Sequence, residues 1–297
     1  MISVFGSVNL DLIGKVDRIP RPGETVPGHE FATAPGGKGA NQALAAARAG
    51  AQVRMIGAAG KDAMGNEALA LLAAGGVDLS EVRRLDLPQG VAMIFVDAHG
   101  ENVIGILPGA NAAMSAADAD RTLAGLGKGD VLVVQQEIGQ EATLRALALA
   151  RQHGARAILN TAPFLPTTAA AAAAADIVVS NETEFELMSG EPPTDAALLR
   201  WAKAHNQTII ATLGPDGARA ATPDGSFAVP SIAITPVDTV GAGDTFVGYL
   251  AAGLEQGRPL ADAMRRAAVA AGLACLKPGA QPSIPTAAEV DARLGQG

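Results

Sequence analysis

Hydrophobic residues follow two different patterns along this chain. Short runs such as VLVV at 131–134 are apolar at every position, which is typical of a strand buried on both faces of a sheet. Stretches such as 141–153 instead repeat apolar residues every three or four positions, as amphipathic helices do. These patterns predict strands at 2–7, 52–58, 131–135, 157–160, 177–180 and 208–212, and helices at 40–49, 64–74, 141–153, 194–205, 244–256 and 260–276.

The alternation of strand and helix predicts an α/β fold with a doubly wound, mainly parallel sheet and helices on both faces. Two stretches interrupt the alternation. Residues 13–35 are rich in Pro and Gly, and residues 90–107 have the pattern of a hairpin. Neither would be stable alone. We predict that two insertions, at approximately 10–36 and 89–110, pair into a small β-sheet lid on a single domain spanning 1–297. A second hairpin, at 218–229, is expected at the edge of the main sheet.

Composition argues against several classes of function. The chain has 297 residues, of which 48% are hydrophobic, enough for a large core. A net charge of −8 argues against a surface for nucleic acid or anionic membranes. The single cysteine, Cys275, lies in an apolar run and is expected in the core. The first residues resemble a strand and not a signal peptide, and no apolar stretch is long enough to span a bilayer. We therefore expect a cytoplasmic protein.

The segment DTVGAGDTF at 238–246 carries the clearest chemical signal. Gly241 and Gly243 allow backbone N–H groups to converge on one point, and an apolar-periodic helix follows them. A helix N-terminus at this position would bind an anion. Asp244 would lie at the positive helix end, where a carboxylate stays ionised and could accept a proton. An oxyanion cradle beside a base suits phosphoryl transfer to a hydroxyl. An ordinary helix cap is the commoner origin of such a segment taken alone.

Two segments offer groups that could hold a sugar. Asn9 and Asp11 follow the first strand at alternate spacing, so in an extended segment both face one way and could hold a vicinal diol. An Asx turn leaving the strand is the alternative. The turn GGKG at 36–39 lacks the spacing of a Walker A loop, but its glycines would let a polyol approach the backbone. Lys38 and Asn41 could then donate hydrogen bonds to hydroxyls, unless the turn is a plain helix entry.

Three further segments follow predicted strands, at the sheet edge where parallel folds bind ligands. Glu137 follows the strand at 131–135, either as a sugar ligand or as a solvated loop acid. In NETE at 181–184, Glu184 could order Mg²⁺-bound water and Asn181 could meet a phosphate, or the two could simply begin a capped helix. The segment TLGPDG at 212–217 could wrap a nucleotide, or it is only a turn. The four histidines show no metal-ligand spacing, and no G-x-G-x-x-G turn follows the first strand.

Taken together and in this order, the motifs resemble the ribokinase-like sugar kinase family. The resemblance runs from Ser3 to about Val290. It rests on seven segments: GSVNLD (6–11), GGKGANQA (36–43), the hairpin at 90–111, NETE (181–184), TLGPDG (212–217), DTVGAGDTF (238–246) and KPGAQPS (277–283). Each segment is weak alone, but seven in the same order make chance negligible.

The resemblance implies a role for each matching residue. Sugar hydroxyls would be held by Asn9, Asp11, Gly37, Lys38, Gly39, Asn41 and Glu137. Asp244 would be the catalytic base, and Gly241, Ala242 and Gly243 the anion hole. Nucleotide contacts would come from Asn181, Thr212, Leu213, Gly214, Pro215, Asp216, Gly217 and Gly243, and Glu184 would hold Mg²⁺ through water. A monovalent cation, usually K⁺, would be bound by the side chains of Asp238 and Ser283 and by the carbonyls of Val240, Ala274, Lys277 and Gly279.

The resemblance implies an ATP-dependent kinase that phosphorylates the 5-hydroxyl of D-ribose and acts as a homodimer through its lid, with no nucleic-acid or membrane partner. The alternatives are a nucleoside kinase, another pentose or ketohexose kinase, or a non-catalytic sugar-binding regulator. Lys38 between glycines and the scarcity of aromatics in the hairpin favour a free sugar. The chain departs from the family at 267–272, where members often carry a polar side chain near the adenine. These residues are all small and apolar here, so packing and backbone would have to hold the base.

Overall fold

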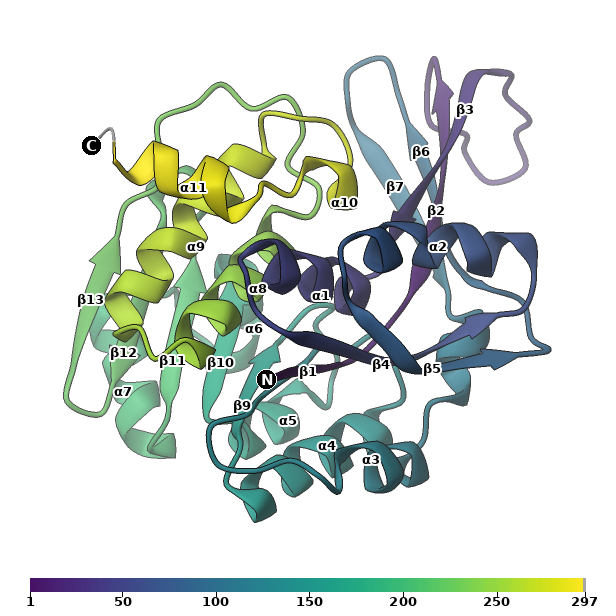
Figure 1. Cartoon of the computed structure of the whole chain (residues 1–297). Helices are drawn as coiled ribbons and strands as arrows, with labels where there is room; N and C mark the ends of the chain where they lie inside the picture. The colour runs from purple at the N-terminus through teal and green to yellow at the C-terminus, as the bar shows by residue number, and fades with distance from the viewer. Residues whose placement is uncertain (296–297) are drawn as a thin grey trace.

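The computed structural model describes residues 1–295, and a nine-stranded sheet forms its centre (Figure 1). Six adjacent pairs from β11 to β5 are parallel, and the β11–β12 and β12–β13 pairs are antiparallel. In spatial order the strands are β13 (Gly225–Val229), β12 (Ala218–Thr222), β11 (Thr208–Thr212), β10 (Ile177–Asn181), β9 (Arg156–Asn160), β8 (Val131–Val134), β1 (Ile2–Phe5), β4 (Val53–Gly60) and β5 (Asp78–Leu85).

Helices cover both faces of this sheet, as Figure 1 shows. Alternate residues of β8 explain why both faces are apolar: Val131 and Val133 pack into one core, and Leu132 and Val134 into the other. The first core is built with α1 (Lys38–Arg48), α2 (Ala63–Ala74), α8 (Ala242–Glu255), α9 (Leu260–Ala274) and α11 (Ala287–Leu294). The second is built with α3 (Ala116–Leu123), α4 (Gln140–His153), α5 (Thr168–Ala174), α6 (Glu182–Ser189) and α7 (Asp195–His205).

The predicted doubly wound sheet is therefore confirmed, and the hairpin of β12 and β13 lies at its edge as expected. Strand β5 was not predicted, because its sequence DLSEVRRL is charged at half of its positions and only one residue is buried. Two helices begin two residues earlier than their apolar pattern indicated, α1 at Lys38 and α8 at Ala242. This difference matters for chemistry, since it places Lys38 and Asp244 inside the first turns of their helices.

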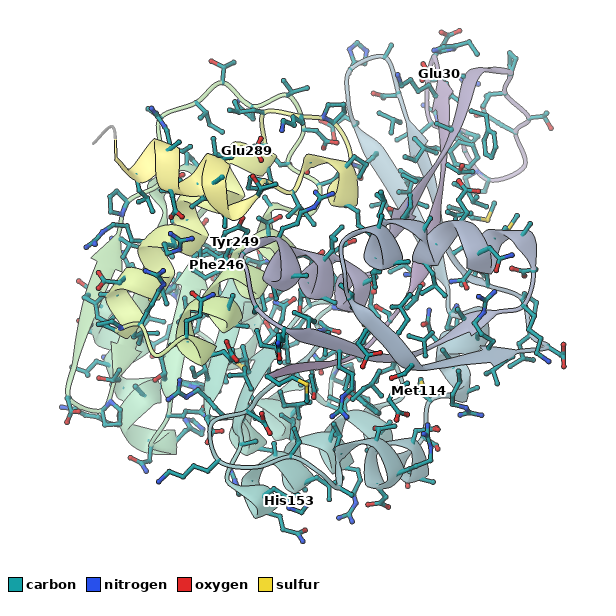
Figure 2. All side chains as sticks on the ribbon, in the orientation of Figure 1. Glu30, Met114, His153, Phe246, Tyr249 and Glu289 are labelled. Carbon is teal, nitrogen blue, oxygen red and sulfur yellow. The ribbon has the colours of Figure 1, made fainter. Side chains whose placement is uncertain are left out.

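The two insertions pair into a separate four-stranded sheet in the order β3-β2-β6-β7. Its strands are β2 (Asn9–Val16), β3 (Gly28–Gly36), β6 (Gly90–Val96) and β7 (Asn102–Leu107). The β2–β6 pair is parallel and joins the insertions, which are far apart in the sequence. The sheet projects away from the main body, and Glu30 lies near its tip (Figure 2).

One consequence of this projection is an unusual amount of exposed apolar surface. All six residues of β7 are exposed, and Phe31 of β3 is 71% exposed. The other exposed large apolar residues of this sheet are Met93, Val103, Ile104, Ile106 and Leu107.

Short helices complete the fold: the 3₁₀ turns η1 (Gly109–Ala113) and η2 (Gly214–Asp216), and the one-turn helix α10 (Ala280–Ser283). Cys275 is buried, as predicted from its apolar neighbours. Within residues 1–295, no helix is long and apolar enough to cross a membrane.

Candidate active site

Asp244 lies in the first turn of α8 and is buried, with 7% of its surface exposed. The helix begins at Ala242 after Gly241, whose φ of 75° is in the left-handed region that favours glycine. A β-carbon at Gly241 would also lie 2.9 Å from the Cα of Ala280, so this turn has no room for a side chain. Asp244 is therefore not the helix cap that the motif alone allowed, and its carboxylate is free to face other elements.

Two consecutive amides of α1 hold this carboxylate. Asn41 Nδ2 donates to Asp244 Oδ2 at 2.9 Å, and Gln42 Nε2 donates to Asp244 Oδ1 at 2.8 Å. The sequence predicted that Asn41 would donate to a sugar hydroxyl. Its amide nitrogen gives one of its two N–H groups to Asp244, while its buried Oδ1 has no hydrogen-bond partner in the described part of the chain. Asn41 therefore offers a ligand an acceptor.

The first turn of α8 also presents backbone donors. Ala242 N–H donates weakly to the Thr239 carbonyl at 3.3 Å. Across the described residues, the N–H groups of Gly241 and Gly243 donate to no other group. Of the three predicted anion-hole amides, two are thus available to an anion and one is partly engaged.

The glycine-rich first turn of α1 packs directly against the residues that follow β1. A β-carbon at Gly39 would lie 2.6 Å from the backbone nitrogen of Ser7, so only glycine fits. Glu137 fastens the same contact, because its Oε2 accepts from Ser7 Oγ at 2.6 Å and from the Lys38 N–H at 3.0 Å. Glu137 is therefore not a solvated loop acid. Glu137 links the segment after β8 to the first turn of α1, where Lys38 lies.

Asn9 and Asp11 lie two residues apart on β2, at the base of the projecting sheet. Asn9 Oδ1 accepts from Asn111 Nδ2 at 2.7 Å, which leaves the Asn9 amide nitrogen as a donor. Asn111 was not predicted. Asn111 also accepts a hydrogen bond from the Val8 N–H and donates one to the Val8 carbonyl. These bonds fix Asn111, which in turn orients the Asn9 amide. Asp11 lies against Gly36, where a β-carbon would come within 2.5 Å of both carboxylate oxygens.

The carboxylates and the lysine gathered here change one another's protonation. Burial, together with the negative charges of Glu137 and Asp244, raises the pKa of Asp11 from 3.8 to about 7, while Lys38 lowers it. Burial alone would lower the pKa of Lys38. Four nearby carboxylates outweigh that effect and raise the pKa of Lys38 above its usual value, so Lys38 stays protonated. They belong to Asp244, Glu137, Glu184 and Asp11.

Asp244 opens on a small cavity of about 150 Å³. Its lining combines the first turn of α8 with the carboxyl ends of β9 and β10, where ligands of parallel sheets bind. The lining residues are Lys38, Asn160, Ala162, Val179, Ser180, Asn181, Glu184, Thr212, Gly241, Gly243 and Asp244.

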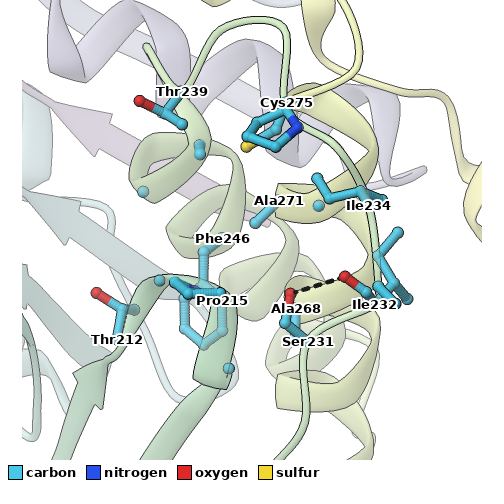
Figure 3. Close-up of a pocket in the computed structure, with 17 residues that line it drawn as sticks. Thr212, Pro215, Ser231, Ile232, Ile234, Thr239, Phe246, Ala268, Ala271 and Cys275 are labelled. Carbon is cyan, nitrogen blue, oxygen red and sulfur yellow. Dashed lines mark hydrogen bonds between the residues drawn. The ribbon is translucent and has the colours of Figure 1, made fainter.

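A second cavity, of about 510 Å³, adjoins the first and shares Thr212 and Gly243 with it (Figure 3). Of the segment expected to contact a nucleotide, Thr212, Gly214, Pro215 and Gly217 line this cavity, and Leu213 and Asp216 do not. One face of α9 also lines it, within the stretch at 267–272 that the resemblance placed near the adenine. The sequence did not predict the lining residues Ser231, Ile232, Ala233, Ile234, Pro236 and Phe246. The segment at 231–236 has no regular secondary structure, so no periodic signal could have revealed it.

The wall of this larger cavity is mainly apolar. Ala268 and Ala271 of α9 and Ile232 and Ile234 of the 231–236 segment belong to this wall (Figure 3), and Gly272 also lines it. A β-carbon at Gly272 would lie 2.5 Å from Ile232 Cγ1, so the glycine lets the 231–236 segment approach the helix. The side-chain polar atoms among the lining residues are hydroxyls and one thiol. Such a surface suits a flat apolar ring.

Asn181 and Glu184 form a reciprocal capping box at the start of α6. Asn181 Oδ1 accepts from the Glu184 N–H at 2.7 Å, and Glu184 Oε2 accepts from the Asn181 N–H at 3.1 Å. Thr161 Oγ1 donates to the same Oε2 at 2.7 Å. The capped-helix interpretation is thus correct for the local structure, and the box also fixes the buried Glu184 carboxylate at the small cavity.

The residues expected to bind a monovalent cation lie in the segment before α8 and in the segment from the end of α9 to the end of α10, which Asp238 joins. Asp238 Oδ1 accepts from the Val240 N–H at 3.0 Å, and its Oδ2 accepts from the Gly279 N–H at 2.8 Å. Ser283 Oγ donates to the Ala280 carbonyl at 2.8 Å and keeps its lone pairs. This donor set of carboxylate, hydroxyl and carbonyl oxygens fits K⁺. No group of three or more His, Cys, Asp or Glu side chains within residues 1–295 forms a metal cage.

Comparison with known proteins decides the family. The sequence model of the pfkB family carbohydrate kinases matches residues 1–287. The chain belongs to this family. Among relatives of this kinase, the ribokinase of Bacillus subtilis is 36% identical over 293 residues, and the alignment covers 99% of each chain. The deoxyribokinase of Salmonella typhi is also 36% identical over 293 residues, covering 96% of this kinase and 95% of the relative.

Solved structures agree with this assignment. The crystal structure of ribokinase from Thermotoga maritima superposes with a TM-score of 0.90 at 33% identity, over 99% of both chains. The structure of Arabidopsis thaliana ribokinase complexed with ribose and ATP superposes with a TM-score of 0.87 at 28% identity, over 99% of this kinase and 98% of that chain. The predicted fold and the predicted sugar phosphotransferase class are confirmed.

Proposed function

We propose that this kinase transfers the γ-phosphoryl group of ATP to the 5-hydroxyl of D-ribose, with Asp244 as the general base. One observation carries the proposal. A buried carboxylate that accepts hydrogen bonds from Asn41 and Gln42 opens on a cavity that Lys38 also lines, and this cavity shares Thr212 and Gly243 with the nucleotide-sized cavity. A ribokinase and a deoxyribokinase are equally similar in sequence, so 2-deoxyribose is the nearest alternative substrate.

On the sugar side, the free groups match a polyol. Asn9 offers an amide donor, Asn41 an orphaned carbonyl acceptor, and Asp11 a carboxylate that accepts from one or two hydroxyls. Glu137 has one oxygen engaged with Ser7 and Lys38 and can accept with the other. Polar groups on three sides of the ligand would orient the sugar with its primary hydroxyl toward Asp244.

In the proposed reaction, the hydroxyl oxygen attacks the γ-phosphorus of ATP in line with the leaving group. The hydroxyl proton passes to Asp244 as the new O–P bond forms. The bond between the γ-phosphorus and the bridging oxygen breaks, and ADP leaves with that electron pair. The available N–H groups of Gly241 and Gly243 and the ammonium of Lys38 offset the negative charge that develops on the transferring group.

The residues also fit the two cations that the family implies. Glu184 keeps one carboxylate oxygen for a hydrogen bond to a metal-bound water, and bound Mg²⁺ would neutralise part of the phosphate charge. K⁺ at Asp238, Ser283 and nearby carbonyls would hold the loop that leads into Gly241.

We further propose that the four-stranded sheet acts as a lid. Asn9 and Asp11 lie on β2, and β3 ends at Gly36, directly before the turn that carries Lys38. Closure of this sheet would bring its sugar ligands toward Asp244 and exclude water.

A coupled assay of ADP release with ribose, 2-deoxyribose, fructose and inosine tests the substrate. We expect the highest kcat/KM for ribose, and phosphorus NMR of the product should place the phosphate on O5. A tenfold preference for any other substrate would replace ribose in the proposal.

Replacing Asp244 by Asn tests the base. The change should lower kcat by roughly 10²–10⁴, the usual contribution of a general base, with little change in sugar affinity. The matched control is Asp262→Asn in the first turn of α9, where the carboxylate is half exposed and pairs with Arg265. A near-wild-type rate for Asp244→Asn would remove it from this role.

A further inference from the structure

Three buried amide side chains lie behind Asp244, and none of them was among the predicted site residues. Gln42 of α1 and Gln135 after β8 are fully buried, and Asn160 at the end of β9 is 9% exposed. Gln42 Nε2 donates both to Asp244 Oδ1 at 2.8 Å and to Asn160 Oδ1 at 3.1 Å. Gln135 Nε2 in turn donates to Gln42 Oε1 at 2.7 Å. The Asp244 carboxylate thus ends a chain of amides from three different elements.

This chain determines which end of the Gln42 amide faces Asp244. An amide has one donor end and one acceptor end, and the two have nearly the same shape. If the Gln42 amide were turned over, its oxygen would face the oxygens of both Asp244 and Asn160, and its nitrogen would face the nitrogen of Gln135. The hydrogen bonds to Asp244 and Asn160 would be lost inside a buried site, where each unpaired group is costly, whereas Gln135 could turn its own amide, whose Oε1 has no other partner. Asn160 cannot relieve the conflict by turning, because its own nitrogen donates to the Val179 carbonyl at 3.2 Å.

The residue directly after β1, Gly6, leaves space for this arrangement. A β-carbon at Gly6 would lie 2.0 Å from Gln135 Oε1, so the glycine at the end of the strand makes room for the Gln135 amide. Gln135 Oε1 has no hydrogen-bond partner in the described structure although it is buried. Burying an unpaired carbonyl lowers stability, so the Gln135 amide is better explained by what its nitrogen does to Gln42 than by stabilisation of the fold.

We propose that Gln42 is a positioning residue for Asp244, that Asn160 sets the orientation of its amide, and that Gln135 holds the other end of that amide. The proposal rests on the proposed role of Asp244 as general base. Asn41 and Gln42 each give one hydrogen bond to a different oxygen of the carboxylate, which prevents rotation of the group. Each oxygen keeps a lone pair for the hydroxyl proton. The base is therefore oriented before the sugar binds.

The variant Gln42→Met keeps the length of the side chain but removes its donor. We expect kcat to fall roughly 10- to 100-fold, as for a lost hydrogen bond to a charged group, with the KM for ribose changed less than threefold. Gln135→Met should lower kcat by a smaller factor, because Gln42 keeps its donor and loses only the hydrogen bond that holds its Oε1. If Gln42→Met does not fold, Gln135→Met tests the same amide chain.

The decisive measurement is a double-mutant cycle on kcat. Because Gln42 acts through Asp244, adding Gln42→Met or Gln135→Met to Asp244→Asn should lower kcat no further. The matched control is Gln207→Met, which removes a buried amide with three hydrogen bonds to Ala172, Ala175 and Trp201, away from Asp244. It should lower stability and leave kcat unchanged.

The outcomes separate this proposal from the proposed function. If both amide variants lower kcat by the same factor with and without Asp244→Asn, or raise the KM alone, the positioning role is wrong and the base assignment stands. If Asp244→Asn by itself has a normal kcat, the base assignment fails and the positioning role fails with it.

Discussion

Asp11 is predicted to weaken the fold while it strengthens sugar binding. Its pKa is raised from 3.8 to about 7 by burial and by the neighbouring carboxylates of Glu137 and Asp244. The native carboxyl therefore keeps its proton to a higher pH than the unfolded one. Between about pH 4 and pH 7 the native state binds more protons, so raising the pH through this window lowers the free energy of unfolding. A shift of this size corresponds to roughly 4 kcal/mol at full ionisation.

Replacing Asp11 by Asn removes the ionisation and therefore the decrease in the free energy of unfolding that it causes. We expect the variant and the wild type to differ little near pH 4.5, and the variant to become more stable by roughly 2–4 kcal/mol at pH 8. Urea unfolding measured by fluorescence of Trp201, the single tryptophan, reports the difference. Asp17→Asn is the control, since its side chain is 89% exposed just beyond the end of β2.

The same variant should bind ribose more weakly. At pH 8 the wild-type carboxylate accepts from sugar hydroxyls, and losing a hydrogen bond to a charged group costs about 1.5–3 kcal/mol, or roughly 10- to 150-fold in KM. Wild-type KM for ribose should fall as the pH rises through about 7, and the KM of Asp11→Asn should not. If the stability gap between variant and wild type is the same at pH 4.5 and pH 8, the reasoning about Asp11 is wrong.

The cation loops, the larger cavity and the exposed sheet face each support one more prediction. Asp238→Ala should make kcat independent of K⁺, whereas the wild type should slow when tetramethylammonium replaces K⁺; a variant that still responds would place the ion elsewhere. The larger cavity offers a purine no charged or amide side chain among its described lining residues, so kcat/KM for GTP should lie within about tenfold of that for ATP. A hundredfold preference for ATP would mean that backbone groups of the cavity distinguish adenine from guanine. Ile104, 53% exposed on β7, should lie in a homodimer interface. Light scattering should find the wild type dimeric and Ile104→Asp monomeric with an unchanged melting temperature, and a dimeric variant would contradict this interface.

Much of the fold could be predicted because its signals are local. A run such as VLVV is apolar at every position only if both sheet faces are covered, and this property is visible within four residues. The glycines of the 241–243 turn likewise predict a tight turn at the start of a helix, and α8 begins at Ala242. Strand β5 was missed because an edge strand with one buried residue carries no such pattern.

Tertiary structure decided how the site residues face one another. Gln42 lies 202 residues from Asp244 and Gln135 lies 93 residues from Gln42, and no periodic pattern connects them. The hydrogen bond from Asn41 to Asp244 was not predicted, because it depends on which acceptor the fold brings near. The pKa of Asp11 likewise depends on carboxylates from other elements. The sequence by itself determined most of the elements, the family and most of the candidate residues, since these follow from local pattern and motif order. Burial, hydrogen-bond direction and charge coupling are properties of long-range packing, so only the folded structure could determine them.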